Sequence, residues 1–136
     1  MIRAYSKAKN GNEKAFKADG TRCAHFKVRE FACSDGSDPV FIDTALVTVL
    51  QSIRNHFGKP VTINSGFRTA SHNKKVGGAT YSQHLYGMAA DIVVSGVAPK
   101  TVAAYVEKLL PNTGGIGIYS TFTHVDVREI KSRWNG

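Results

Sequence analysis

The feature that most constrains the fold is an amphipathic segment, FIDTALVTVLQSIRNHFG, at residues 41–58. Its apolar residues recur at intervals of three and four, which places them on one face of a helix. These residues are Ile42, Leu46, Val49, Leu50, Ile53 and Phe57. Asp43 is a suitable N-cap, Gly58 a suitable stop, and Pro60 follows it. The pattern predicts a helix that packs one face against a core.

A second helix is predicted in APKTVAAYVEKLLP, where Pro99 stands near the start and Pro111 ends the pattern. TASHNKKVGG indicates a short helix followed by a loop. Strand patterns occur in PVTINSGFR, AADIVVSG, GGIGIYS and FTHVDVRE, the last two joined by a tight turn around Ser120–Thr121. Two long helices on a small, mostly antiparallel sheet define an α+β fold class.

The chain of 136 residues fits one domain. Residues 1–22 are polar, rich in Lys, Asn and Gly, and lack periodicity, so we expect a basic, extended or partly ordered N-terminal arm before a single domain at 23–136. No apolar run approaches the roughly 20 residues that span a bilayer, and we expect no membrane insertion. The start has no apolar core of a secretory signal. We therefore expect synthesis in the cytoplasm, with release or export by another route if the substrate lies outside.

The formal net charge is +8, from 18 basic and 10 acidic residues. Such a surplus favours polyanionic partners, but the basic residues are dispersed rather than gathered on one element with aromatics between them. A solvated basic surface is therefore favoured over nucleic-acid binding. Cys23 and Cys33 form no CxxC motif, which argues against a zinc knuckle. We expect them to be reduced and structural.

The stretch SQHLYGMAADI at 82–92 places His84 seven residues before Asp91. One interpretation is a loop leading into a strand, with an ordinary core histidine. The other is a pair of metal ligands that converge because the small residues between them let the backbone fold tightly. A third ligand must come from elsewhere.

The third ligand is predicted in FTHVDVRE. Strand side chains alternate between faces, so Phe122, His124 and Asp126 share one face. His84, Asp91 and His124 would supply two imidazoles and one carboxylate. Three protein ligands with the fourth position left to water are typical of a catalytic zinc site, whereas a structural site has four protein ligands.

The motifs SGFRT, HN, VGG and SQHLYGMAADI, followed by GGIGIYSTFTHVDVR, resemble the zinc D-Ala-D-Ala carboxypeptidase family over about residues 25–134. That family belongs to the group that joins lysostaphin-type peptidases, D-Ala-D-Ala metallopeptidases and the hedgehog amino-terminal domain. The resemblance implies the hedgehog/D-Ala-D-Ala peptidase fold, a Zn²⁺ cofactor held by His84, Asp91 and His124, and cleavage of peptidoglycan stem peptides at bonds involving D-amino acids. Many small members without a signal are phage or prophage endolysins.

The resemblance also suggests roles around the metal. Arg68 in SGFRT matches an arginine that faces substrate, where it stabilises an oxyanion or holds a terminal carboxylate. Ser82, Gln83 and Tyr86 are candidate substrate-binding residues, with local loop bonding or packing as the alternative. Several relatives place the general base three positions before the last ligand, where this chain has Thr121.

Asp126 is the expected substitute for that base. Its alternative role is a carboxylate that orients a histidine ligand or pairs with Arg68 or Arg128. The sequence thus predicts a monomeric zinc peptidase acting on peptidoglycan. The competing hypotheses are a non-catalytic metal-containing binding module on the same scaffold and a basic nucleic-acid-binding domain, which would leave the histidines unexplained.

Overall fold

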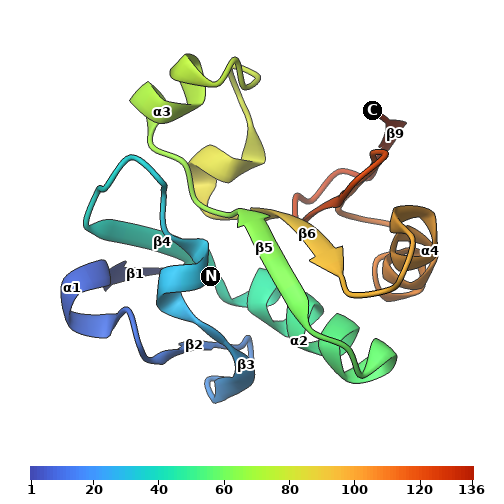
Figure 1. Cartoon of the computed structure of the whole chain (residues 1–136), viewed down its shortest axis with the longest axis horizontal. Coiled ribbons are helices and arrows are strands. Elements are labelled where there is room, and N and C mark those ends of the chain that lie inside the picture. Colours follow the sequence, from blue (N-terminus) through green and yellow to red (C-terminus); the bar gives the residue numbers. More distant parts are fainter.

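The computed structural model describes all residues, 1–136. Its largest sheet has five strands in the order β5-β6-β8-β7-β9 (Figure 1). The strands are β5 (Val61–Ser65), β6 (Ala89–Val94), β7 (Gly115–Ile118), β8 (Thr123–Asp126) and β9 (Ser132–Asn135). All neighbouring strands are antiparallel except β7 and β9, which run parallel. The predicted α+β class and the mostly antiparallel sheet are confirmed.

Both long helices form where the periodicity predicts them, as α2 (Thr44–Phe57) and α4 (Pro99–Leu109). The Asp43 carboxylate caps α2 by accepting a hydrogen bond from the backbone N–H of Ala45 at 2.8 Å. Gly58 ends α2 with a φ of 63°, a left-handed conformation that suits glycine. Ile42 differs from the prediction because it lies in strand β4 (Pro39–Asp43), whose pairing with the N-terminal strand keeps it extended.

The core lies on one face of the five-stranded sheet. Alternate residues of β6, namely Ala90, Ile92 and Val94, join Ile116 and Val125 in a cluster with the apolar faces of α2 and α4. In Figure 1, α2 passes behind β5 and α4 lies beside β6. The opposite face of the sheet carries the other alternate residues, Asp91 and His124 among them.

The N-terminal segment is folded, which differs from the expected arm. Strand β1 (Ile2–Ser6) pairs with β4, and β2 (Lys14–Phe16) pairs with β3 (Arg22–Lys27), while a short helix α1 (Lys7–Asn10) joins β1 to β2. Ala15 is fully buried, and the Tyr5 hydroxyl accepts a hydrogen bond from the Phe16 backbone N–H at 3.1 Å. Pairing with strands distant in the sequence orders a segment that has no periodicity of its own.

Three short helices complete the fold: η1 (Val28–Phe31), α3 (Ala70–Lys75) and η2 (Gln83–Tyr86). Cys23 and Cys33 are free and buried in the core cluster, as expected of reduced structural cysteines. None of the helices combines the length and apolarity that crossing a bilayer requires.

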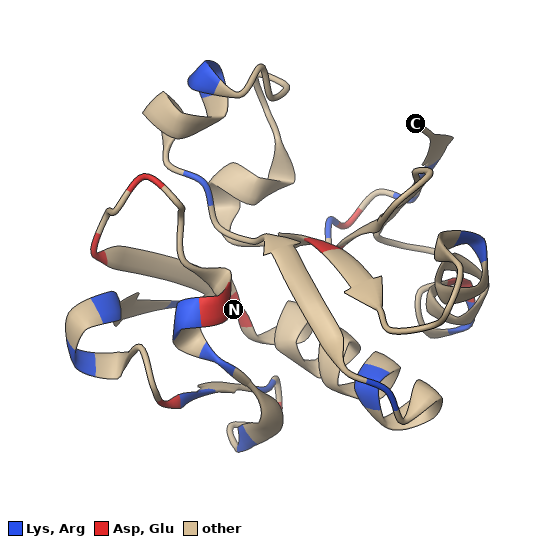
Figure 2. Ribbon diagram, in the orientation of Figure 1, with Lys and Arg blue, Asp and Glu red and all other residues tan.

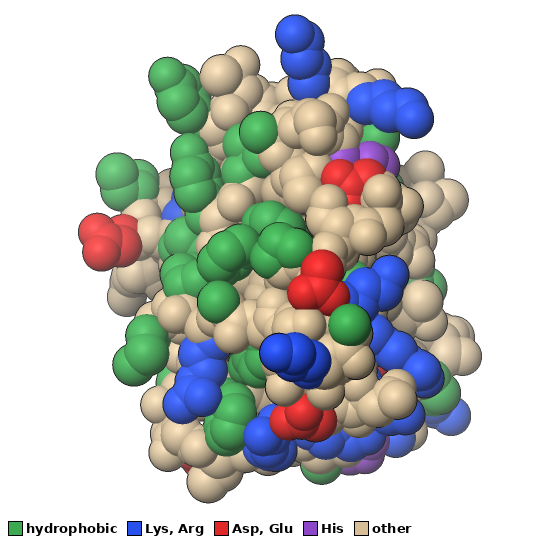
Figure 3. Space-filling view, turned by 90° about the vertical axis from the view of Figure 1, so that its left-hand side faces the viewer, with side chains coloured by type: hydrophobic (Ala, Val, Ile, Leu, Met, Phe, Trp, Pro, Cys, Tyr) green, Lys and Arg blue, Asp and Glu red, His purple; other side chains and the backbone are tan.

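Lys and Arg are spread over most elements rather than concentrated on one (Figure 2). On the face shown in Figure 3, hydrophobic side chains extend from the upper left to the middle, while Lys and Arg lie mostly in the lower half, with Asp and Glu among them, and at the top. The basic surface is therefore dispersed in space as well as in sequence.

Candidate metal centre

The register of β6 and β8 brings Asp91 and His124 together. The two residues are direct partners across this antiparallel pair, so their side chains project from the same face. Nδ1 of His124 lies 2.9 Å from Oδ1 of Asp91. Both residues are largely buried, with exposed fractions of 8% for Asp91 and 7% for His124.

His84 reaches the same point from η2, outside the sheet. The Ser82 hydroxyl caps η2 by accepting a hydrogen bond from the His84 backbone N–H at 3.3 Å. Gly87 ends the turn with a φ of 70°, and a Cβ there would collide with the carbonyl of Phe41. Nε2 of His84 lies 3.3 Å from Oδ2 of Asp91. One ligand atom from each of His84, Asp91 and His124 lies within 4.8 Å of the others.

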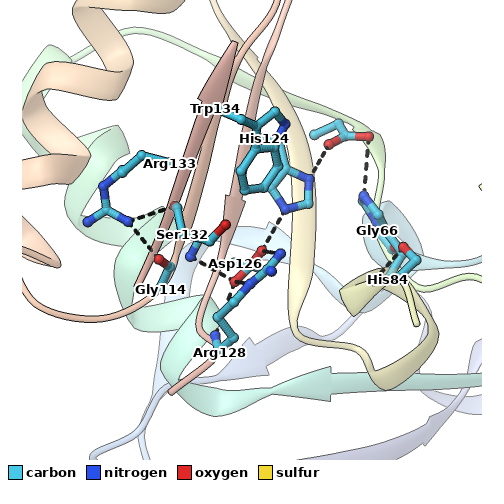
Figure 4. Close-up of polar contacts among 12 residues, drawn as sticks. Gly66, His84, Gly114, His124, Asp126, Arg128, Ser132, Arg133 and Trp134 are labelled. Atoms are coloured by element: carbon cyan, nitrogen blue, oxygen red, sulfur yellow. Dashed lines mark hydrogen bonds and ion pairs between the residues drawn. The ribbon is translucent and has the colours of Figure 1, made fainter. Parts of the chain in front are cut away.

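The far nitrogen of each imidazole is held by an acceptor (Figure 4). Nδ1 of His84 donates to the carbonyl of Gly66 at 2.7 Å, and Nε2 of His124 donates to Oδ2 of Asp126 at 2.7 Å. A carbonyl oxygen can only accept, so Nδ1 of His84 carries a hydrogen and Nε2 is the nitrogen that faces Asp91. This second contact fixes the orientation and tautomer that a metal-binding histidine needs.

The electrostatics of Asp91 and His124 favour a cation at this site. Burial opposes the charged form of Asp91, but hydrogen bonds from His124 and His84 outweigh it and hold the pKa of Asp91 well below its usual range. Burial also opposes a charge on His124, while its bonds to Asp126 and Asp91 raise the pKa of His124. The pocket therefore favours positive charge between the two rings and the carboxylate, and a divalent cation fits that donor set.

Asp126 is fully buried and its carboxylate is saturated with hydrogen bonds. Oδ1 accepts from the backbone N–H of Gly115 at 2.8 Å and from the backbone N–H and Nε of Arg128 at 3.1 and 2.8 Å. Oδ2 accepts from Nη2 of Arg128 at 2.5 Å and from Nε2 of His124 at 2.7 Å. These are the contacts of a carboxylate that orients His124 and pairs with Arg128, the alternative to a base. They leave no oxygen of Asp126 facing the cleft.

Two glycines of β7 make room on the site face. Gly115 lies opposite Asp126 and Gly117 opposite His124. A Cβ at Gly115 would collide with the Asp126 carboxylate, and one at Gly117 would lie 2.5 Å from the indole of Trp134. The alternation of glycine and isoleucine in GIGI is the sequence signal for this arrangement, because period 2 separates the site face from the core face.

The three ligand candidates open onto a cleft of about 350 Å³. Arg68 stands at its wall, with Nη2 at 3.7 Å from Oδ2 of Asp91. The guanidinium is fixed by hydrogen bonds to Oγ of Ser65 at 3.2 Å and Oδ1 of Asn73 at 3.3 Å. Asp91 is the one acidic side chain in the lining of this cleft.

Of the predicted substrate-binding residues, Ser82 and Gln83 line the cleft, although the Ser82 hydroxyl is also engaged in the local cap described above. Tyr86 is 46% exposed and is not part of the lining. The sequence interpretation missed four lining residues that lie on or beyond the β7–β8 hairpin. They are Tyr119, Phe122, Arg128 and Trp134.

Two imidazoles and one carboxylate that converge from separate elements, with one side open to a cleft, form the ligand set of a catalytic rather than a structural metal site. The chain matches the model of the family described as Peptidase M15 over residues 24–126, a range that contains all three ligand candidates. The chain belongs to the peptidase M15 family.

A curated relative indicates which metal ion fits the site. A stretch of 51 residues is 53% identical to the zinc D-Ala-D-Ala carboxypeptidase of Streptomyces albus G. The match covers 35% of this chain and 20% of the length of that relative. Together with the buried His–Asp–His set, it supports Zn²⁺ as the cofactor.

Proposed function

We propose that the protein is a zinc peptidase that hydrolyses bonds involving D-amino acids in the stem peptides or cross-links of peptidoglycan. Membership of the peptidase M15 family and the zinc D-Ala-D-Ala carboxypeptidase relative support this proposal. The observation that carries it is the convergence of His84, Asp91 and His124 at the floor of an open cleft. The sheet and its helices are compatible with the hedgehog/D-Ala-D-Ala peptidase fold, which we assign to the chain.

In this proposal His84, Asp91 and His124 hold Zn²⁺. When bound, such an ion supplies a Lewis acid for the scissile carbonyl and lowers the pKa of a water molecule. The Gly66 carbonyl and Asp126 keep the two imidazoles oriented. Arg68 is positioned to hold a terminal carboxylate in a two-pronged contact or to stabilise an oxyanion. Asp126 acts through His124 and not as a proton acceptor for water.

A non-catalytic, metal-containing binding module is the second candidate. It is favoured by one observation: apart from the ligand candidate Asp91, no acidic side chain lines the cleft to serve as a general base. Both candidates bind the metal and the wall, so only turnover separates them.

The test is mass analysis of products from purified peptidoglycan and from a synthetic stem pentapeptide ending in D-Ala-D-Ala. A carboxypeptidase releases one terminal D-Ala, whereas an endopeptidase releases cross-link fragments from the polymer. Chelation should abolish either activity, and added zinc should restore it. His84→Ala and His124→Ala should lose both zinc and turnover. Wall binding without any product would support the binding module and overturn the peptidase.

We also propose that the protein reaches the wall after release or export by another route, as an endolysin does. The test is expression inside a bacterial cell. Growth should continue until a separate pore-forming protein opens the membrane, and lysis should then follow only for the active protein. Lysis without membrane opening would contradict this proposal.

A further inference from the structure

Tyr119 has an unused hydrogen-bond donor in the candidate cleft. It follows β7 at the start of the β7–β8 turn and lines the cleft together with Asp91 and His124. Its hydroxyl oxygen accepts a hydrogen bond from Nε1 of Trp134 at 2.9 Å. The hydroxyl proton has no acceptor within the protein, so it remains available to a molecule in the cleft.

Packing holds the Tyr119 ring from several sides. One face stacks on Phe122 with ring centroids 4.3 Å apart and an interplanar angle of 10°. Gly136 lies so close to the ring that a Cβ there would collide with it. Trp134, which donates to Tyr119, sits over Gly117, and its ring centroid is 5.0 Å from that of His124. The phenol is therefore a fixed group, joined through one indole to the ring of a metal-ligand candidate.

The topology places Tyr119 and Arg68 on different sides of the metal-ligand candidates. Arg68 follows β5, which flanks β6 at one edge of the sheet, whereas Tyr119 follows β7 on the other side of β8. A substrate lying across Asp91 and His124 would meet a guanidinium on one side and a phenol on the other.

We propose that Tyr119 is a further catalytic residue, which donates a hydrogen bond to the substrate carbonyl oxygen as that oxygen gains negative charge. This assignment rests on the proposed peptidase function. Acceptance of the Trp134 N–H polarises the phenol and strengthens it as a donor. A preorganised donor aimed at developing charge stabilises the transition state more than the ground state. The proton stays on the phenol oxygen, and Trp134 is the positioning residue that orients it.

The first test is Tyr119→Phe, which removes the hydroxyl and keeps the ring. We expect kcat on the stem peptide to fall by about 10²-fold, with KM and zinc content nearly unchanged. The matched control is Tyr105→Phe on α4, which removes a hydroxyl that contacts the Ser52 carbonyl far from the cleft at 3.5 Å. That variant should keep the wild-type kcat.

The second test is a double-mutant cycle with Trp134→Phe. Alone, this change should lower kcat by roughly tenfold, since the donor remains but loses its orientation. In the Tyr119→Phe background it should have no additional effect, because Trp134 acts through the hydroxyl. Independent, multiplicative losses would contradict the positioning role.

A third test needs neither zinc nor turnover. Trp134 is the only tryptophan of the chain, so its emission reports on the bond to Tyr119. Emission from the zinc-free protein should shift in Tyr119→Phe and stay unchanged in Tyr105→Phe.

Absence of hydrolysis by the zinc-loaded wild type would overturn the proposed function and this role with it. Wild-type turnover with an equally active Tyr119→Phe would overturn the role of Tyr119 alone.

Discussion

At the scale of single residues, Asp126 connects the metal centre to the sheet. Its carboxylate binds one imidazole, one guanidinium and two backbone N–H groups, which come from β7, from β8 itself and from Arg128 just after β8. Glu107 and Arg133 form another carboxylate–guanidinium pair, on α4 and β9, at 2.7 Å, but Glu107 is partly exposed and contacts no ligand candidate. The two pairs therefore differ in whether the carboxylate also binds a metal-ligand candidate, as Asp126 binds His124.

Asp126→Asn tests this difference. The amide can no longer balance the guanidinium of Arg128 or hold His124 by charge, so we expect zinc affinity to fall by about 10- to 100-fold. The free energy of unfolding should drop by about 1–3 kcal/mol because a charged hydrogen-bonded group loses its partner. Competition with a chelating dye and urea unfolding measure the two effects.

Glu107→Gln is the control for Asp126→Asn, and it should leave zinc affinity unchanged. The result that contradicts this expectation is full zinc affinity in Asp126→Asn together with lost turnover. That result would assign the proton-acceptor role to Asp126 and remove the orienting role.

At the scale of elements, β7 presents glycine to the site and isoleucine to the core. Gly117→Ala should displace the Trp134 indole, because its Cβ would lie 2.5 Å from the ring. We expect a loss of about 1–3 kcal/mol in the free energy of unfolding from overpacking, and a change in tryptophan emission. Ser120→Ala, in the exposed turn after β7, should cause neither. Unaltered emission in Gly117→Ala would show that the indole does not rest on this glycine.

The loop before β4 is tied to the start of α3 by Asp35. Oδ2 of Asp35 accepts from the Thr69 hydroxyl at 2.6 Å, and Oδ1 accepts from the Ser37 backbone N–H at 2.9 Å. Thr69 in turn caps α3. The bonds from Thr69 and Ser37 hold the pKa of Asp35 well below its usual range.

The lowered pKa of Asp35 makes the free energy of unfolding depend on pH in a definite direction. The stabilising effect of the Asp35 bonds is fully present above the unfolded pKa of about 3.9, and it is lost as the pH falls through the lower folded-state pKa. Asp35→Asn should therefore destabilise the protein at pH 6 more than at pH 2, as measured by denaturant unfolding. An Asp35 carboxyl that titrates near 3.9 by NMR would contradict the tie to α3.

Local sequence patterns predicted the helices and strands whose formation depends on neighbouring residues. The period of α2, its Asp43 cap and its Gly58 stop all lie within the helix itself or next to it. The pairing of β1 with β4 and of β9 with β7 depends on contacts between separate segments. The polar residues 1–22 therefore showed no pattern that predicts the first pairing. The convergence of His84, Asp91 and His124 could be predicted because histidine and aspartate carry their chemistry in the side chain. The roles of Tyr119 and Trp134 could not, because they depend on which rings the hairpin brings together.

At the scale of the whole molecule, the net charge of +8 is spread over the surface. A dispersed positive field attracts a polyanionic cell wall at long range and is screened by salt. Adsorption to purified walls should therefore weaken as ionic strength rises from 0.05 to about 0.5 M, whereas hydrolysis of a soluble, neutral stem peptide should change little. Sedimentation of the protein with walls measures the first effect.

A variant with reduced net charge separates the contribution of the surface charge to wall adsorption from the activity of the candidate site. Four exposed lysines that do not line the cleft can be changed to glutamate, which brings the net charge close to zero. They are Lys7, Lys59, Lys74 and Lys75. Wall adsorption should fall while turnover of the soluble peptide is kept. Adsorption that is equally strong and insensitive to salt would show that the wall is bound through specific contacts instead.

The direct pairing of Asp91 with His124 also bears on how the chain reaches its final form. A one-residue slip of β6 along β8 would turn Asp91 toward the helices and set an aliphatic neighbour beside His124. Only the correctly aligned strands can then capture the ion, and capture adds its binding energy to that alignment alone. Zinc binding would thus favour the correct alignment of the two strands during folding.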